Sequence, residues 1–283
     1  MRIKGVDLSY CQEGISFPAL KQAGVKFAII RAGFSTKKDV TMDRFVADCK
    51  KYGIAYGFYW YSYAMSVKQA ESEAEKCVDV IKGLSPTYPV FFDMEEKKQI
   101  SSLNTDTRTK MAIAFCEKIR QAGFKTGIYA NPSFMEHYYD KSRIIGKYDI
   151  WLAHWTNSPD CPSRYDYGQT MWQWGVDKIG GYDVDGDICF TDYSSKTVDE
   201  LADEVLAGKW DNGAERERLL TAAGYDYNAV QKRINEKLYR KTVDEIANEV
   251  IAGLWGNGTE RKEKLTEAGY DYSAVQKRVN EML

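Results

Sequence analysis

Four carboxylates in this sequence occupy positions where acid–base chemistry is possible. Asp7 falls in the first hydrophobic run of the chain, Asp93 and Glu95 in the run VFFDME, and Asp185 in the last such run before residue 194. Because the side chains of a strand alternate between its two faces, Asp93 and Glu95 share one face about 7 Å apart along the chain. Two acids in one apolar pocket tend to separate into a protonated and an ionised group. Cleavage of a glycosidic bond requires such a pair.

The same acids also have a purely structural interpretation, in which each caps a helix or pairs with Arg31. That interpretation weakens if four acids from three strands meet at one end of a barrel, because buried, uncompensated charge is costly. Two neighbouring acids are treated separately. Glu96 has the opposite strand parity and precedes two lysines, so we expect it on a solvent-facing loop. Asp187 follows Asp185 by two residues, and we favour Asp185 as the fourth acid of the site.

Aromatic residues gather near the same predicted strand ends. Tyrosine, tryptophan and phenylalanine make up 13% of the chain. This content suits either a large core or a groove that stacks on sugar rings, and strand alternation assigns at least half of the rings to packing. Those closest to the strand ends, Tyr61, Tyr129 and Trp174, are the predicted substrate contacts. Gln173, between two tryptophans, is equally compatible with a hydrogen bond in the site and with a surface role.

The elements that must position these side chains alternate in a regular order up to residue 193. Short β-branched and aromatic runs are separated by helical patterns, most of which end at a glycine. This order predicts an α/β fold, an irregular TIM-like (β/α) barrel of parallel strands joined by helices. An open, doubly wound sheet is the competing architecture, although no glycine-rich phosphate loop follows any strand. The predicted strands are 3–9, 26–33, 55–63, 90–95, 126–130, 150–155, 171–174 and 182–190, and the predicted helices are 18–23, 42–52, 67–82 and 106–122.

The last third of the chain is an internal duplication. Residues 197–238 and 242–283 are identical at 29 of 42 aligned positions. Each copy contains three helical patterns, and each opens with a T-x-x-E capping box, at Thr197 and Thr242. We therefore predict two small all-α three-helix bundles after the barrel, so that the chain has three domains: 1–193, 197–238 and 242–283.

The composition argues against several other classes of function. Lysine plus arginine (39) nearly balance aspartate plus glutamate (41), so the net charge of −2 provides no general attraction to nucleic acid or anionic lipid. With only two histidines, His137 and His154, a histidine metal site or a Ser/His/Asp triad is not expected, and no other cofactor is suggested. Six scattered cysteines without a C-x-x-C pair favour reduced thiols. The N-terminus lacks a signal-peptide pattern and no apolar run approaches about 20 residues, which predicts cytoplasmic synthesis and no membrane insertion.

Five short motifs make residues 1–193 resemble glycoside hydrolase family 25, a family of lysozymes that includes many phage endolysins. The motifs are VDLS at 6–9, FFDME at 91–95, GIYAN at 127–131, WLA at 151–153 and VDGD at 184–187. The resemblance implies an irregular (β/α) barrel that cleaves the β-1,4 bond after N-acetylmuramic acid in peptidoglycan. It also implies Glu95 as general acid/base with Asp93 as its partner. Asp7 and Asp185 would be the other two acids of the site.

The two repeats are similar to cell-wall-binding family 7 modules, with which they share the patterns AGxWxNG, ER and AGYDYxAVQ. This resemblance implies recognition of the muropeptide backbone. Arg216 and Arg261 are candidate ligand contacts, as are Trp210 and Trp255. A lone tryptophan in so small a bundle more often belongs to its core.

These features lead to one preferred hypothesis and three alternatives. The preferred hypothesis is an endolysin, a retaining N-acetylmuramidase that two weak modules tether to bacterial peptidoglycan. It would be made in the host cytoplasm. It would then reach the wall through a membrane lesion formed by a holin. The alternatives are a bacterial autolysin of the same activity, a wall-binding protein with an inactive barrel, and a chitinase-like barrel. The last would need an acid where Phe91 stands, so the sequence argues against it. Assistance by the substrate's N-acetyl group, in place of direct attack by a carboxylate, stays open.

Overall fold

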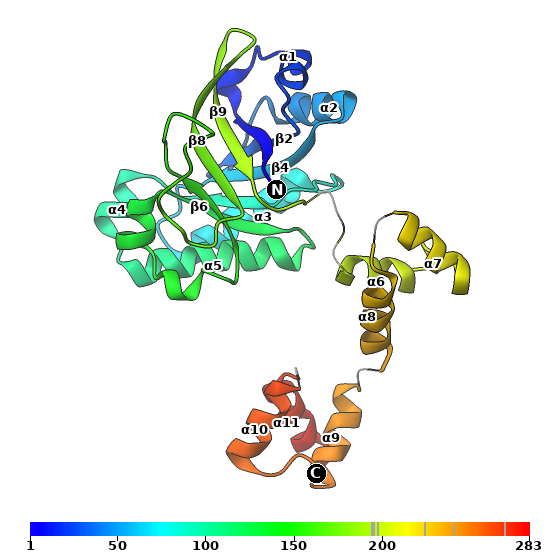
Figure 1. Cartoon of the computed structure of the whole chain (residues 1–283). Helices are drawn as coiled ribbons and strands as arrows, with labels where there is room; N and C mark the ends of the chain where they lie inside the picture. Colours follow the sequence, from blue (N-terminus) through cyan, green and yellow to red (C-terminus); the bar gives the residue numbers. More distant parts are fainter. Residues whose placement is uncertain (194–195, 197, 224, 240, 269) are drawn as a thin grey trace. The chain divides into compact units, whose positions relative to one another are not determined.

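The chain folds into two compact units, Met1–Ser195 and Lys196–Leu283, which we describe separately (Figure 1). The computed structural model describes residues 1–193, 196, 198–223, 225–239, 241–268 and 270–283. Thr197, the capping residue predicted for the first repeat, lies outside the described residues.

Three helices of the first unit begin directly after a capping side chain. Ser16, Ser66 and Asn104 each accept a backbone N–H of the helix that follows. The four predicted helices all form, as α1, α2, α3 and α5, and α4 is an additional short helix. The elements are β1 (Ile3–Leu8), η1 (Tyr10–Gln12), α1 (Phe17–Gln22), β2 (Phe27–Phe34), β3 (Lys37–Lys38), α2 (Met42–Tyr52), β4 (Ala55–Tyr61), α3 (Val67–Ile81), β5 (Val90–Asp93), α4 (Lys97–Ser102), α5 (Thr105–Gln121), β6 (Thr126–Ala130), η2 (Phe134–Tyr138), η3 (Lys141–Arg143), β7 (Asp149–Ala153), β8 (Met171–Ile179) and β9 (Tyr182–Cys189).

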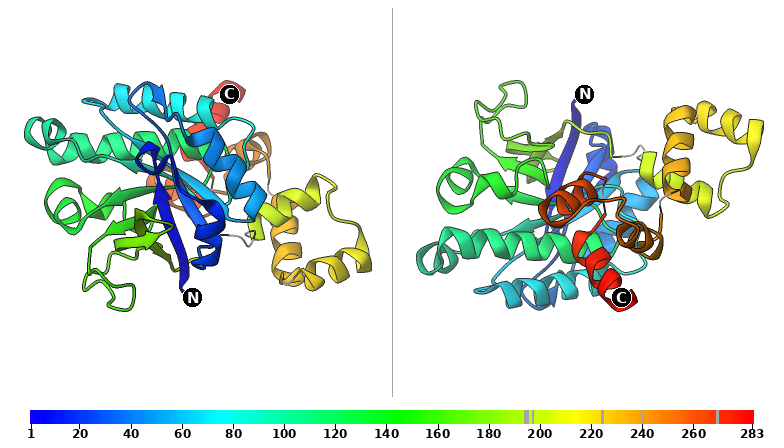
Figure 2. Two further views of the ribbon diagram at one scale, coloured as in Figure 1. Left: turned by 90° about the horizontal axis from the view of Figure 1, so that it is seen from above. Right: turned by 90° about the horizontal axis from the view of Figure 1, so that it is seen from below.

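Eight of these strands form a closed barrel. They follow one another in the order β1-β9-β8-β7-β6-β5-β4-β2, and the pairing of β2 with β1 closes the ring, while β3 pairs only with the end of β2. Within the ring of eight strands, all neighbouring pairs are parallel except the two that involve β9. Seen from above, helices flank the strands (Figure 2). The predicted α/β barrel is therefore confirmed, and the open doubly wound sheet is excluded.

The last two strands differ from the prediction of parallel crossovers. β8 and β9 form an antiparallel hairpin in which Ile179 pairs with Tyr182 across Gly180 and Gly181. These glycines have φ of 60° and 86°, the left-handed conformation of a two-residue hairpin turn. Such a connection is too short for a crossover. Residues 154–170, between β7 and β8, form a loop without a helix. As a result, β9 runs opposite to the other seven strands.

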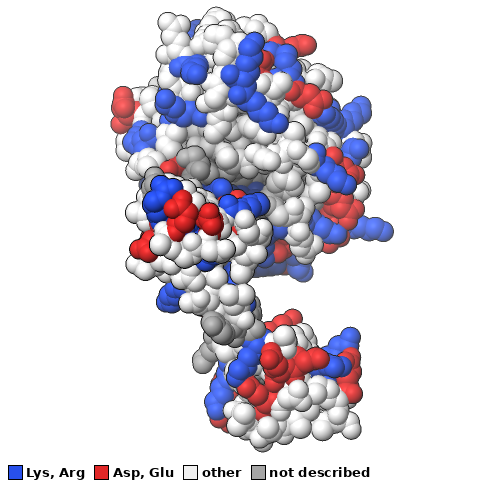
Figure 3. All heavy atoms as spheres, turned by 90° about the vertical axis from the view of Figure 1, so that its right-hand side faces the viewer, with Lys and Arg blue, Asp and Glu red and all other residues white. Residues whose placement is uncertain are grey.

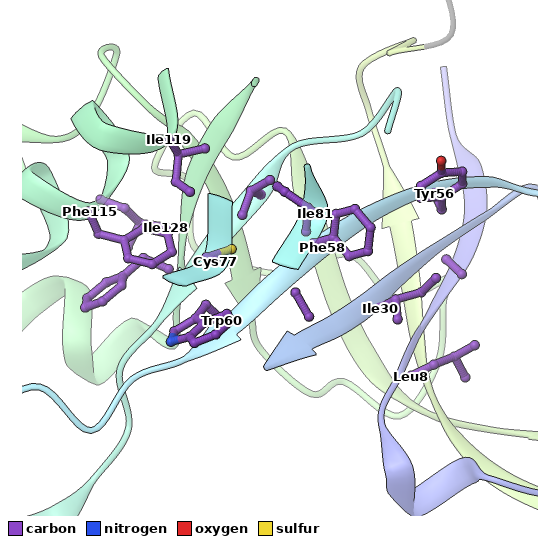
Figure 4. Packing of buried hydrophobic residues seen from close by; sticks show 14 of the residues in the cluster. Leu8, Ile30, Tyr56, Phe58, Trp60, Cys77, Ile81, Phe115, Ile119 and Ile128 are labelled. Carbon is purple, nitrogen blue, oxygen red and sulfur yellow. The ribbon is translucent and has the colours of Figure 1, made fainter. Parts of the chain in front are cut away.

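The main core lies between the outer faces of the strands and the surrounding helices. Along β4, Phe58 and Trp60 point outward into this core, where Phe58 lies beside Ile81 and Trp60 beside Cys77, both from α3 (Figure 4). The intervening residues Tyr59 and Tyr61 belong to the interior of the barrel. This alternation of side chains is what the sequence predicts for a strand with two buried faces.

A second, smaller core fills the barrel interior with aromatic rings. Phe27, Phe91 and Trp151 are its largest buried members. The rings fit because neighbouring strands carry glycines: a Cβ on Gly5 would lie 2.2 Å from the ring of Phe27, and one on Gly127 would lie 2.6 Å from the ring of Phe91. These close approaches leave no space for any side chain at either glycine.

The second unit contains two helical repeats, each with three helices and its own hydrophobic core. At the start of the second repeat, Thr242 and Glu245 form the predicted capping box. The helices are α6 (Val198–Leu206), α7 (Gly213–Ala222), α8 (Tyr227–Tyr239), α9 (Val243–Ile251), α10 (Gly258–Glu267) and α11 (Tyr272–Met282). The buried core residues are Leu201, Ala202, Val205, Leu220, Val230 and Ile234 in the first repeat and Ile246, Ala247, Val250, Leu265, Val275 and Val279 in the second.

The surface carries both signs of charge. Lysine and arginine are interspersed with aspartate and glutamate on the face shown in Figure 3, which agrees with the net charge of −2. Among the described helices, none has the length and apolar character to cross a membrane. The six cysteines are free; four are buried, while Cys11 and Cys161 are exposed.

Candidate active site

Two cavities with shared walls lie at the mouth of the barrel. The smaller, of about 160 Å³, is lined mainly by acids and aromatic rings, and the larger, of about 470 Å³, extends towards the loop after β7. Four residues line both cavities: Glu95, Tyr129, Gln173 and Asp185. The cavities therefore form one candidate site, with a deep end and a more open end.

The four predicted acids all line the smaller cavity. Asp93 is the last residue of β5 and Glu95 follows two residues later, so strand alternation directs both side chains to the same side. Asp7 near the end of β1 is the register partner of Asp185 on β9. Because β9 is antiparallel, its first residues, rather than its last, lie beside the carboxyl ends of the other strands. The direction of β9 was predicted wrongly, but the four acids still come together as predicted.

Burial is the largest influence on each of these acids and raises all four pKa values. The charge of Asp185 further raises the pKa of Asp7, and the charge of Glu95 does so for Asp93. For Glu95 the second cause is again Asp185. A cluster of this kind retains protons at a pH where isolated carboxyls have lost them. It can therefore hold a proton donor beside an ionised carboxylate.

Arg31 is the cation that lines the smaller cavity. Its Nε donates to Asp39 Oδ2 at 2.7 Å, and its guanidinium lies over the rings of Tyr10 and Phe34. The positive charge opposes the rise in the pKa of Asp93. The ion pair of Arg31 is thus with Asp39, whereas the structural interpretation of the acid cluster would pair Arg31 with one of the four predicted acids.

Gln173 connects both sides of the site. It is 4% exposed, and its Nε2 donates to Asp7 Oδ2 at 2.8 Å. Its Oε1 accepts from the hydroxyl of Tyr129 at 3.0 Å and from Nε1 of Trp155 at 2.9 Å. The surface role that the sequence left open is therefore wrong, and the amide is part of the site.

If this site cleaves glycosidic bonds, as the resemblance implies, Gln173→Ala should lower kcat by about 10- to 100-fold, because a hydrogen bond to a charged group contributes about 1.5–3 kcal/mol. Release of reducing ends from purified walls would measure this, with the exposed Gln22→Ala as control. An unchanged kcat for Gln173→Ala would show that Asp7 does not need this contact.

The predicted aromatic contacts divide into two that reach the site and one that does not. Tyr61 lines the smaller cavity and Tyr129 lines both. The hydroxyl of Tyr61 donates to Glu96 at 3.0 Å, so Glu96 is a half-buried partner of the site rather than a free loop residue. Trp174 lies on the outer face of β8, 5% exposed and packed with Trp172. Its placement in the site was wrong because Gln173 takes the inward position, which turns its neighbours outward.

Several lining residues were not singled out from the sequence. Asn131, His154 and Trp155 line the larger cavity, and Tyr59 and Trp151 line the smaller one. Along β7 and the residues after it, every second side chain faces the cavities, and this alternation predicts three of the lining positions, Trp151, Ala153 and Trp155. Trp155 is 52% exposed while its Nε1 is bonded to Gln173, so its ring is available for stacking. Among the described residues, no group of His, Cys, Asp and Glu is placed to hold a metal ion.

The candidate residues of the repeats make the same contacts in both copies. Arg261 donates from Nε to Gly256 O (3.0 Å), from Nη1 to Gln276 Oε1 (3.1 Å) and from Nη2 to Asn257 Oδ1 (2.8 Å). Arg216 repeats this pattern in the first copy. Each arginine therefore fixes the loop before the second helix of its repeat, and no described residue accepts from the other two of its five N–H groups.

Each tryptophan of the repeats donates a hydrogen bond to a glutamate of its own repeat. Trp210 Nε1 donates to Glu204 and Trp255 Nε1 donates to Glu249, both at 3.0 Å. Both rings are packed against the hydrophobic core of their repeat. This placement favours the core role that the sequence analysis considered more common.

Comparisons with known proteins agree on one family. Residues 6–179 match Glycosyl hydrolases family 25, and residues 199–238 and 244–283 match the CW_7 repeat. The chain is 30% identical over 230 residues to the lysozyme of Streptococcus phage Cp-7, an alignment covering 77% of this chain and 65% of the phage protein. It is 24% identical over 238 residues to the autolytic lysozyme of Clostridium acetobutylicum, covering 82% of this chain and 66% of that protein.

Solved structures share the fold. The bacterial lysozyme from Streptomyces coelicolor superposes with a TM-score of 0.60 at 23% identity, over 68% of this chain and 93% of that chain. The modular autolysin LytC from Streptococcus pneumoniae gives a TM-score of 0.58 at 24% identity, over 67% of this chain and 47% of that chain. The present chain thus spans less than two thirds of the phage lysozyme and about half of the pneumococcal autolysin.

Proposed function

Because this chain belongs to glycosyl hydrolases family 25 and carries two CW_7 repeats, we propose that it is a cell-wall lysin of the endolysin type. Its barrel would hydrolyse the β-1,4 bond between N-acetylmuramic acid and N-acetylglucosamine in bacterial peptidoglycan. The observation that carries the proposal is the cluster of Asp7, Asp93, Glu95 and Asp185 around one cavity at the barrel mouth.

In the proposed reaction, Glu95 is the general acid. It gives its proton to the glycosidic oxygen as the bond from C1 to that oxygen breaks. Asp93, beside Arg31, is the carboxylate that stabilises the positive charge developing on the sugar ring. Water then adds to C1, and its proton returns to Glu95. Burial and the charge of Asp185 raise the pKa of Glu95, which helps it to enter the reaction protonated, while Arg31 opposes the rise that burial causes in the pKa of Asp93.

The bond that is cut can be identified from the ends of the products. Purified peptidoglycan would be digested, the fragments reduced with borohydride and analysed by mass spectrometry. Reduced muramic acid ends are expected. Reduced glucosamine ends would mean that the other glycosidic bond is cut, and an absence of released fragments would favour a wall-binding protein without activity.

The two repeats would hold the enzyme on its insoluble substrate. Two tethered modules of low affinity bind a polymer more tightly than either alone, since binding of the first raises the effective concentration of the second. Arg216 and Arg261 support this role, because each fixes a loop and retains free donors. Access to the wall through a holin lesion stays a prediction.

Replacing both arginines by lysine, Arg216→Lys with Arg261→Lys, should lower retention on purified walls about tenfold or more. A lysine ammonium cannot span the three acceptors that each guanidinium bonds. Co-sedimentation with walls measures retention, in a Glu95→Gln background that prevents digestion. The control is Arg218→Lys, because Arg218 is exposed and, among the described residues, bonds to Glu215 alone. Equal retention of all variants would remove these arginines from the wall-binding role.

A further inference from the structure

Glu95, the proposed proton donor, lies on a short irregular segment of the backbone. Residues 94–96 follow β5 and precede α4 without belonging to either element. No described residue donates a hydrogen bond to the carboxyl of Glu95. The place of this carboxyl in the cavity therefore depends on how the segment that carries it is held at its two ends.

Hydrogen bonds hold both ends of this segment. Just before it, the carbonyl oxygen of Asp93 accepts from Ser62 N at 2.7 Å. At its end, Glu96 N donates to Oε1 of Gln99 at 3.1 Å. That N–H belongs to the planar peptide group between Glu95 and Glu96, so its direction also fixes the Cα atom of Glu95. Gln99 thus acts directly on the backbone of the proposed acid.

The amide of Gln99 uses both of its ends. The side chain is 0% exposed, and its Nε2 donates to the carbonyl oxygens of Ser62 at 3.1 Å and Ala64 at 2.8 Å. Because backbone carbonyls only accept and the backbone N–H of Glu96 only donates, these partners determine which way the amide points. Gln99 therefore joins the segment after β5 to the loop after β4.

The loop after β4 is itself held at each of its backbone N–H groups. The bond of Ser62 N is described above. Tyr63 N donates to Oε1 of Glu73 on α3 at 3.0 Å, and Ala64 N donates to Oγ of Ser62 at 3.2 Å. Ser62 and Ala64 are also buried. Gln99 is thus bonded to a part of the chain that has little freedom to move.

A simpler role for Gln99 would be to cap α4. A glutamine at the third position of a helix commonly accepts the N–H of the capping residue. Gln69 occupies this position in α3, where it is exposed and its Oε1 accepts from Met65 N at 2.7 Å. Capping requires only the oxygen of the side chain. The buried nitrogen of Gln99, which bonds two carbonyls of another segment, indicates a further role.

We propose that Gln99 is a positioning residue that fixes the backbone of Glu95, and with it the carboxyl of the proposed proton donor, to the loop after β4. The catalytic consequence rests on the proposed function, whereas the attachment itself rests on the three hydrogen bonds of the Gln99 side chain. A displacement of about 1 Å can cost about 100-fold in rate, so loss of the attachment should lower kcat.

The first test compares Gln99→Met and Gln99→Asn with the parent on purified peptidoglycan. Methionine matches the length of glutamine without its hydrogen bonds, and asparagine keeps the amide but is too short to reach all three partners. Both variants should lower kcat about tenfold or more, with KM within about twofold of the parent, because Gln99 lines neither cavity.

The matched control is Gln69→Met, which removes the corresponding contact in α3 and should leave kcat unchanged. Asparagine keeps a polar group beside the buried carbonyls, so Gln99→Asn decides the test if Gln99→Met does not fold. Parental kcat in either folded variant would overturn the proposal.

A double-mutant cycle tests whether Gln99 acts through Glu95. In the Glu95→Gln background there is no acidic proton to position. Gln99→Met should then lower the residual rate by less than about twofold. A further loss as large as that in the parent background would show that Gln99 acts on another part of the site, and would overturn the proposal.

Amide hydrogen exchange measured by mass spectrometry tests the attachment without activity. Fragments that contain Glu96 or the loop 62–64 should exchange about tenfold or more faster in Gln99→Met and Gln99→Asn than in the parent, and at the parental rate in Gln69→Met. Unchanged protection in the Gln99 variants would overturn the proposal. If the parent releases no fragments from peptidoglycan, the proposed function fails, while the exchange rates still decide whether Gln99 holds the segment.

Discussion

Glu95→Gln is expected to abolish lysis, with kcat on peptidoglycan reduced about 10³-fold or more. Glutamine matches glutamate in shape but has no acidic proton, so the leaving oxygen would depart as an unstable alkoxide. General acid catalysis contributes about 10²–10⁴-fold in enzymes, and the half-buried position of Glu95 beside Asp185 is typical of such an acid. Release of reducing ends from purified walls, followed over hours, measures the residual rate.

The matched control for this variant is Glu96→Gln. Glu96 is the adjacent residue, is likewise half-buried, and accepts a hydrogen bond from Tyr61 without lining either cavity itself, so its loss should lower kcat by no more than a few-fold. Both variants should sediment with walls as the parent does, since the repeats are unchanged. Lysis at the parental rate by Glu95→Gln would assign the proton donor to another acid of the cluster.

Gly5→Ala is expected to lower the free energy of unfolding of the barrel by about 3 kcal/mol, at the upper end of what overpacking costs. The added methyl group would lie 2.2 Å from the ring of Phe27. That ring is itself stacked on Tyr88 at a centroid distance of 4.4 Å, so it has little freedom to move. Urea denaturation followed by circular dichroism would measure the change.

A double-mutant cycle identifies the clash as the cause. Phe27→Leu alone creates a cavity and destabilises the barrel, but it removes the ring that the new methyl group would strike. The cost of Gly5→Ala should therefore be much smaller in the Phe27→Leu background than in the parent. Equal costs in both backgrounds would show that Gly5 is required for another reason.

Much of the barrel follows from local patterns of sequence. Three of the four predicted helices begin close to the expected residues because serine or asparagine caps fix their starts, and a glycine follows the end of all four. The common face of Asp93 and Glu95 follows from strand alternation alone. These two acids meet Asp7 because β1 and β5 run in the same direction, which places their carboxyl ends at the same end of the barrel. The helical connections between the strands impose this direction.

The features that the sequence did not predict depend on contacts between distant segments. The inward position of Gln173, and therefore the outward position of Trp174, is set by the pairing of β8 with β7 and β9. The antiparallel direction of β9 results from a turn of two glycines, which the pattern of hydrophobic runs does not reveal. Glu96 is held by Tyr61 from another strand, a contact that parity and flanking lysines cannot indicate.

The pairing of β1 with both β2 and β9 also constrains how the protein folds during its synthesis on the ribosome. Asp7 is made almost first, yet its register partner Asp185 is made more than a hundred residues later. The barrel closes only when these segments meet, and closure over such a separation is slow relative to local helix formation. The repeats, in contrast, can fold through contacts between residues that are close in sequence. A nascent or prematurely terminated chain that ends before β9 would therefore lack an assembled acid cluster, so hydrolytic capacity should arise only when the barrel is complete.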